Sequence, residues 1–143
     1  MKRSIKMLCS CLFAGMFVMV ASAFDDVKGW QMGQAEWMHV QINESFDYDQ
    51  AFETAVEILS DKYEMGMIKK DGGYVRTAWN FYRKTRGTLD KKVRIRITLK
   101  FNDDRTQVAV KTEVQKLIFK EWVDGYSNVL GYQVRKELQD VLQ

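Results

Sequence analysis

Proline is absent from the chain, histidine occurs once and cysteine occurs twice. Without proline, nothing in the backbone forces a helix to kink. The single histidine, His39, is too little for a common zinc site, which needs three or four histidine, cysteine or carboxylate ligands. It also leaves any Ser-His or Cys-His nucleophile pair dependent on one residue, and no nucleophile-elbow motif accompanies it. The sequence therefore predicts no catalytic site, no metal site and no cofactor.

Both cysteines, Cys9 and Cys11, lie within the first 23 residues. This segment begins with Lys2, Arg3 and Lys6, continues with an apolar run over residues 7–20, and ends Ala21-Ser22-Ala23. A basic start, a short apolar core and a small-residue exit are typical of a secretory signal peptide. We therefore predict that residues 1–23 are cleaved off after Ala23 and that the protein is exported, to the periplasm or outside a bacterial cell.

A membrane anchor and a lipoprotein are the two other interpretations of this segment. A membrane anchor needs about 20 apolar residues, and the run here is shorter and is interrupted by Gly15. A lipoprotein is suggested by Leu8-Cys9-Ser10-Cys11, which loosely resembles a lipobox. A lipidated cysteine ends the hydrophobic run, however, whereas Cys11 stands near its start. A cleaved and unlipidated protein is the prediction.

Removal of the leader changes the charge of the protein. The leader contains three of the 22 lysines and arginines and no acidic residue, so the remainder has as many basic as acidic residues, 19 of each. General nucleic-acid binding requires a surplus of positive charge, and we predict no nucleic-acid partner. The cysteines leave with the leader, so the predicted domain has no disulfide and must be stabilised by packing alone.

The N-terminal part of the predicted mature chain combines a loose arm, a strand and a helix. Residues 24–35 show no clear periodicity and are predicted to form an N-terminal arm. Residues 36–44 alternate as a strand does. Asp47 begins a helix that we expect to run from about Tyr48 to Lys62, with its apolar residues at helical spacing.

After this helix, the spacing of apolar residues changes from the 3.6-residue period of a helix to the two-residue period of a strand. Strands are predicted over residues 65–70 and 74–83, joined by a turn at Asp71-Gly72-Gly73. Two further strands, over residues 93–101 and 108–115, alternate apolar and polar side chains, as expected for a sheet with one buried face. Asp124-Gly125 is interpreted as a loop, and an amphipathic helix is predicted from about Ser127 to Leu142.

These elements predict one α+β domain over residues 36–143. The expected architecture is a two-layer sandwich in which an antiparallel sheet of about four strands packs two helices on one face, in the order β-α-β-β-β-α. Oligomeric state is not predictable from this pattern.

The same order of elements, with the phrase Asp49-Gln50-Ala51-Phe52 leading into the first helix, resembles the small helix-grip envelope domains of the BamC family of outer-membrane assembly lipoproteins. The resemblance covers residues 36–142. It implies a helix-grip fold in the cell envelope. Members of that family have a lipidated cysteine, for which this chain has no counterpart after the predicted cleavage.

The strongest functional indication is a row of basic residues on the predicted outer face of adjacent strands. Such a row suits an acidic or lipidic ligand or another envelope protein. Its alternative role is to solvate the open face of the sheet and to discourage aggregation. The candidate partner surface consists of Tyr74, Arg76, Tyr82, Arg94, Arg96, Lys100 and Lys111.

Three of the tryptophans allow two interpretations. Trp30, Trp37 and Trp122 would mark a partner surface if they are exposed together, and would be packing residues if they cover the open end between helix and sheet. Trp79 is predicted to face inward.

Two functions follow from these observations. The first is a non-enzymatic interaction module of the bacterial cell envelope. The alternative is a carrier of a small hydrophobic ligand or lipid, because a helix against a curved sheet can leave an apolar pocket. The residues expected to line that pocket are Phe52, Met65, Met67, Trp79 and Ile97.

Overall fold

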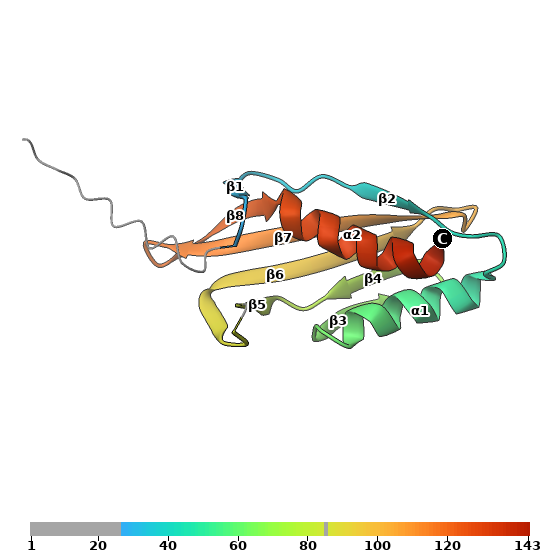
Figure 1. Ribbon diagram of the computed structural model, residues 1–143, viewed down its shortest axis with the longest axis horizontal. Helices are drawn as coiled ribbons and strands as arrows, with labels where there is room; N and C mark the ends of the chain where they lie inside the picture. Colours follow the sequence, from blue (N-terminus) through green and yellow to red (C-terminus); the bar gives the residue numbers. More distant parts are fainter. Residues whose placement is uncertain (1–26, 85) are drawn as a thin grey trace, which may run out of the picture.

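The computed structural model describes residues 27–84 and 86–143, so the predicted signal peptide (1–23) and the start of the predicted arm lie outside the described residues (Figure 1). Its elements are, in order, β1 (Trp30–Met32), β2 (Met38–Gln41), α1 (Tyr48–Ser60), β3 (Met65–Lys69), β4 (Tyr74–Thr77), β5 (Asn80–Arg83), β6 (Leu89–Phe101), β7 (Gln107–Ile118), β8 (Glu121–Ser127) and α2 (Asn128–Leu142).

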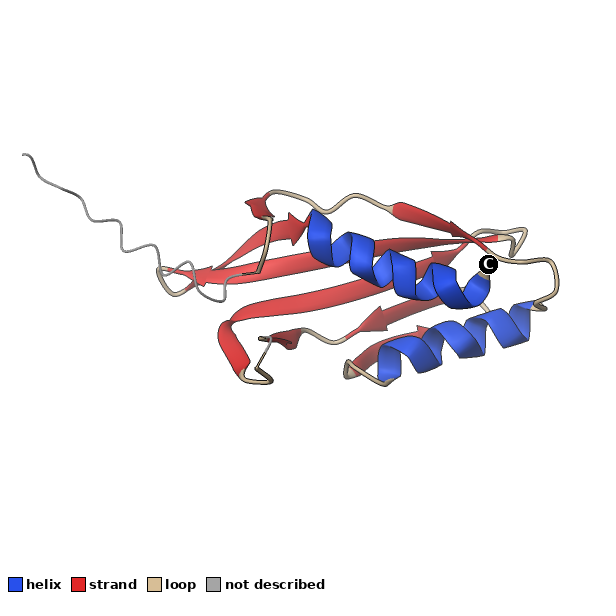
Figure 2. Ribbon diagram, viewed as in Figure 1, coloured by secondary structure: helices blue, strands red, loops and turns tan. Residues whose placement is uncertain are grey.

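All eight strands belong to one sheet. Its main order is β1-β8-β7-β6-β4-β3, with β2 beside β7 and β5 beside β6, and all of these neighbouring strands are antiparallel. The predicted four-strand sandwich is therefore wrong, because the protein is mostly β-structure built on an eight-stranded sheet. Figure 2 shows how the long strands β6 and β7 extend through the molecule while the other strands are short.

The sheet has two chemically different faces, which we name by strand β6. Its inner face presents Val93, Ile95, Ile97, Leu99 and Phe101, all of them buried. Its outer face presents the residues between them. Helix α2 packs against β2 and β7 and contacts α1, and the apolar residues of both helices join the inner face in one core. The alternation predicted for residues 93–101 is confirmed by this burial pattern.

Both helices begin where the sequence indicated. Asp47 caps α1, accepting a hydrogen bond from the Gln50 N–H at 2.8 Å, and the Gln50 side chain accepts one from the Asp47 N–H at 3.2 Å. Ser127 caps α2 by accepting from the Leu130 N–H. Reciprocal capping satisfies backbone donors that a helix leaves unpaired at its start.

One extra residue divides the strand predicted over residues 74–83. Arg76 pairs with Thr98, but Asn80 pairs with Ile95, so the register advances by one position around Ala78 and Trp79. The Asn80 amide and the Ala78 N–H both hydrogen-bond to Glu64, which fixes the irregularity. Because side chains alternate along a strand, a one-residue insertion turns the following residues to the opposite face.

Two further strands lie where loops were predicted. The Asp124-Gly125 pair lies inside β8 rather than in a loop. A Cβ on Gly125 would lie 2.4 Å from the Trp30 indole nitrogen, so the glycine is required for the close approach of Trp30. Trp30 itself opens β1, which pairs with β8, and part of the predicted loose arm therefore belongs to the sheet.

Candidate interaction surface

The strand register brings six of the seven predicted surface residues to the outer face. Tyr74 lies opposite Lys100 across the β4–β6 pair, and Arg76 lies opposite Thr98. Across the β6–β7 pair, Thr98 lies opposite Lys111, and the alternation places Arg94 and Arg96 on the same face. The seventh residue, Tyr82, is half-buried and packs against the hydrophobic core, so it is not part of this surface.

Three tryptophans contact the cations of the outer face. The Arg94 guanidinium lies 4.0 Å from the centre of the Trp122 ring and 4.9 Å from that of Trp79. Arg96 lies 4.4 Å from the Trp79 ring, and the Lys111 ammonium lies 5.1 Å from Trp37. Cations over indole faces at such distances are attracted by the ring quadrupole.

Polar side chains of β7 and β8 connect these cations into one network. The Arg94 Nε donates to the Gln115 Oε1 at 2.6 Å, and the Gln115 Nε2 donates to Asp124 at 2.6 Å. Arg96 donates two hydrogen bonds to the Glu113 carboxylate, at 3.0 and 3.2 Å. A bidentate pair fixes the orientation of both side chains. We call this set the tryptophan–arginine network: Trp37, Trp79, Arg94, Arg96, Lys111, Glu113, Gln115, Trp122 and Asp124.

The network keeps its arginines close together in spite of their like charge. Partial burial, and secondarily the charge of Arg96, lower the pKa of Arg94, while Asp124 raises it. Lys111 lies 3.8 Å from Glu113, the carboxylate that already binds Arg96. The Glu113 carboxylate thus pairs with two cations, and the outer face keeps a surplus of positive charge.

Two cations of the outer face lie outside the network. Within the part of the chain that the structure describes, neither Arg76 nor Lys100 has an ion-pair partner. Helix α1, which packs on the inner side of the sheet, contains Asp49, Glu53 and Glu57 and no lysine or arginine, and Lys70 pairs with two of these acids.

The predicted ligand pocket is not assembled. Phe52 and Ile97 are buried in the core and Met65 packs against it. Met67 lies opposite Arg76 in the β3–β4 pair, and Trp79 lies under the arginines of the outer face. The inward orientation predicted for Trp79 is wrong because of the extra residue beside Ala78. These five residues lie on two sides of the sheet and do not line one cavity.

The three remaining tryptophans separate into two groups. Trp37 and Trp122 join the outer-face network, whereas Trp30 donates from its indole nitrogen to the Val114 carbonyl at 3.2 Å and covers Gly125. The sequence analysis did not predict this division, because it placed Trp122 just before a loop at Asp124-Gly125 and expected no strand there. The alternation of Trp122 with Asp124 and Tyr126 was the pattern that could have revealed the strand.

Besides a cavity of about 420 Å³ between α1 and β3, one of about 310 Å³ opens between β7, the first turn of α2 and residues 34–38. Thr112 lines it, and among the described residues the Thr112 hydroxyl is the buried side-chain polar atom without a hydrogen-bond partner. Neither β2 nor β8 pairs with residues 111–113, where the neighbour of β7 changes from one strand to the other.

Within residues 27–84 and 86–143, no group of three or more histidine, cysteine, aspartate or glutamate side chains could hold a metal ion. No helix of these residues has the length and hydropathy to cross a membrane. No family model matches the chain, and no curated protein matches its sequence.

Proposed function

We propose that the protein is a non-enzymatic interaction module of the bacterial cell envelope that binds an acidic protein partner through the outer face of its sheet. The observation that supports this most directly is the tryptophan–arginine network with its two unpaired neighbours, Arg76 and Lys100. The proposal includes export: residues 1–23 act as a signal peptide, and the mature protein begins at Phe24.

The network suits recognition because its cations are already ordered. A guanidinium held between indole rings and hydrogen-bonded at Nε loses little conformational freedom when it meets a carboxylate. Tryptophan and arginine are also enriched among residues that dominate binding energy at protein interfaces. The unpaired cations beside the network add attraction at longer range, which accelerates association with an acidic surface.

The geometry favours the carrier alternative less, because its expected lining is divided between the core and the outer face. The resemblance to BamC-type domains stays a prediction. The order of elements that motivated it differs from the order described above, which has two strands before α1 and six between the helices.

The test is a charge reversal that leaves the network intact. Arg76→Glu with Lys100→Glu should weaken binding to an acidic polypeptide, for which poly-glutamate is the probe, by about tenfold or more. Titration calorimetry at low salt measures the affinity. Cross-linking in envelope extracts should identify a partner that the same variant loses.

The matched control reverses two cations on the helix side, Lys62→Glu with Lys136→Glu, and changes the net charge by the same amount. Both lysines are exposed and pair with acids of α2. If both variants lose binding equally, the interaction depends on net charge and the proposed surface is wrong. Export is tested separately by intact mass and N-terminal sequencing, where an acylated Cys11 or a retained leader would contradict it.

A further inference from the structure

The turn between β7 and β8 exposes an aromatic ring at an unfavourable backbone position. Phe119 is 97% exposed, and Ile118 beside it is 38% exposed. Ile118 pairs with Glu121, so Phe119 and Lys120 form a two-residue turn, with φ of 48° and 67°. Asparagine and glycine are the residues that such turns favour, because positive φ is costly for a bulky side chain. The fold itself gains no packing from Phe119.

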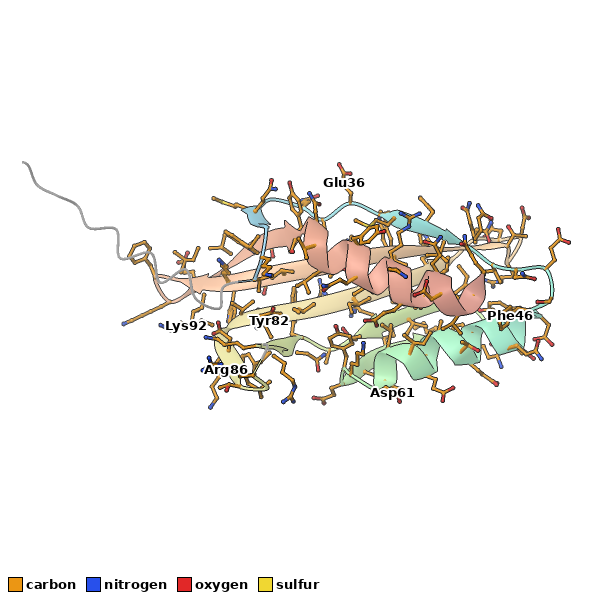
Figure 3. All side chains as sticks on the ribbon, in the orientation of Figure 1. Glu36, Phe46, Asp61, Tyr82, Arg86 and Lys92 are labelled. Carbon is orange, nitrogen blue, oxygen red and sulfur yellow. The ribbon has the colours of Figure 1, made fainter. Side chains whose placement is uncertain are left out.

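Positive charge gathers at the end of the sheet that carries this exposed ring. Val93 pairs with Lys116, so the start of β6 and the end of β7 lie at the same end of the sheet. Segments 86–92 and 116–121, which we call the hairpin end, contain five lysines and arginines and two acidic residues. Within the described residues, Arg86, Lys91, Lys92 and Lys120 have no ion-pair partner. Figure 3 shows Arg86 and Lys92 at this end, far from Phe46 at the other.

We propose that the hairpin end docks on the surface of an anionic lipid bilayer, with Phe119 and Ile118 entering the boundary between headgroups and acyl chains. A protein partner requires a broad complementary patch, whereas the β7–β8 turn reaches beyond β6 as a narrow tip (Figure 1). This tip carries the exposed Phe119 and Ile118, and exposed cations lie at the same end of the sheet. A small apolar insertion combined with several lysines near anionic lipids is the combination that gives peripheral membrane binding. Lysines can also direct their ammonium groups toward headgroups while their stems contact apolar surface.

This inference does not depend on the proposed function, because it uses different residues. The outer-face variant Arg76→Glu with Lys100→Glu retains the entire hairpin end. It should therefore still bind the bilayer, although it loses the acidic polypeptide. Loss of one property without the other distinguishes the two proposals.

The experiment is co-sedimentation of the proposed mature protein, beginning at Phe24, with vesicles of phosphatidylglycerol and phosphatidylethanolamine, compared with vesicles of phosphatidylcholine alone. The basic and apolar residues 1–23 are absent from the protein and from all variants, because such a segment would itself bind anionic lipid. The unchanged protein should prefer the anionic vesicles, and added salt should weaken its binding.

Phe119→Asn is the decisive variant. Asparagine tolerates positive φ, so the folded state should be as stable as before or more so, while binding to the anionic vesicles should weaken by about ten- to a hundredfold. Thermal unfolding verifies that the variant is folded. Phe119→Trp should keep the binding, and its additional fluorescence should be quenched by lipids brominated in the acyl chains.

Charge is tested with Lys91→Gln and Lys92→Gln together, which should lower the affinity by about tenfold. Lys62→Gln with Lys136→Gln removes the same charge from the helix side and should change the affinity little. The inference is overturned if the protein binds neither vesicle better than the other, or if Phe119→Asn binds as well as the unchanged protein. If Phe119→Asn still binds and only the lysine variant loses binding, the protein adsorbs by charge and inserts no apolar side chain.

Discussion

The two faces of strand β6 are built from alternate residues of the same segment, yet they have different roles. The inner face is apolar and buried, and Ile97 and Leu99 at its centre have no exposed surface. The outer face consists of cations whose stems and guanidinium groups lie against tryptophan rings. Burial of apolar surface contributes most of the stability of such a domain, whereas partly exposed ion pairs contribute little.

This difference predicts which substitutions the fold tolerates. Substitutions on the inner face should reduce stability, and substitutions on the outer face should mainly alter binding. Thr98 is an intermediate case. It belongs to the outer face by register but is only 3% exposed, because the long side chains around it cover it. The outer face is therefore a packed layer rather than a row of freely solvated charges.

The largest effect is expected at the centre of the inner face. Ile97→Ala should lower the free energy of unfolding by about 2–5 kcal/mol, through lost burial and a residual cavity. Lys100→Ala, an exposed outer-face position on the same strand, should cost well under 1 kcal/mol. Chemical denaturation measures both. Equal costs at the two positions would contradict the assignment of the faces.

The next effect distinguishes two buried hydroxyls. The Thr77 Oγ1 accepts a hydrogen bond from the Ile97 N–H at 3.0 Å, so Thr77→Val should leave that donor unpaired and cost about 1–3 kcal/mol. Thr112→Val replaces a hydroxyl that lacks a partner, and it should be neutral or stabilising. A substantial loss of stability in Thr112→Val would mean that the cavity beside it contains a molecule bonded to the hydroxyl.

A smaller effect is expected on the outer face. Arg94→Ala removes a cation that lies over two tryptophan rings, together with the apolar stem that covers them, and should cost about 1–2 kcal/mol. The fluorescence of Trp79 and Trp122 should change as well. Arg76→Ala is the control, and a similar loss of stability there would show that the rings contribute nothing specific.

The smallest effect concerns alkaline pH. Burial, with smaller contributions from Glu137 and Tyr82, raises the pKa of Tyr63 above its ordinary value of 10.0. As pH rises past 10.0, the unfolded chain releases this proton before the folded one, so stability is complete below that pH and falls above it. Tyr63→Phe should reduce the slope of this fall in a series of denaturation curves. Tyr132→Phe, at an exposed position, is the control that should retain the original slope.

Local signals predicted the helices and the longest alternating strand. Asp47 and Ser127 have the side chains that cap helix starts, and these boundaries are within two residues of those observed. Strand β6 alternates over its whole central part, so its faces were predicted correctly. In such segments the local preference and the tertiary packing agree, and sequence reasoning is then reliable.

Long-range contacts explain the errors. The glycine in Asp124-Gly125 indicates a turn by itself, but in the fold it provides room for Trp30, which is distant in the chain. The extra residue near Ala78 is fixed by the backbone of Glu64 and has no local signal. For the site, the cations were predictable from alternation. Their tryptophan partners were not, because Trp79 changes face at the irregularity and Trp122 lies in a strand that was missed.

The pairing of the first strands with the last elements has a consequence for biosynthesis. The Asn43 N–H donates to the Leu142 carbonyl, and the Ser127 hydroxyl donates to the carbonyl of Lys28, 99 residues away. The β6–β7 hairpin needs only a short loop, whereas residues 27–43 pair with β7, β8 and the end of α2, all of which lie in the C-terminal part of the chain. On a growing chain the N-terminal segment therefore stays unpaired until these elements have emerged, and under the proposed export this would leave it open to translocation machinery that accepts only unfolded polypeptide.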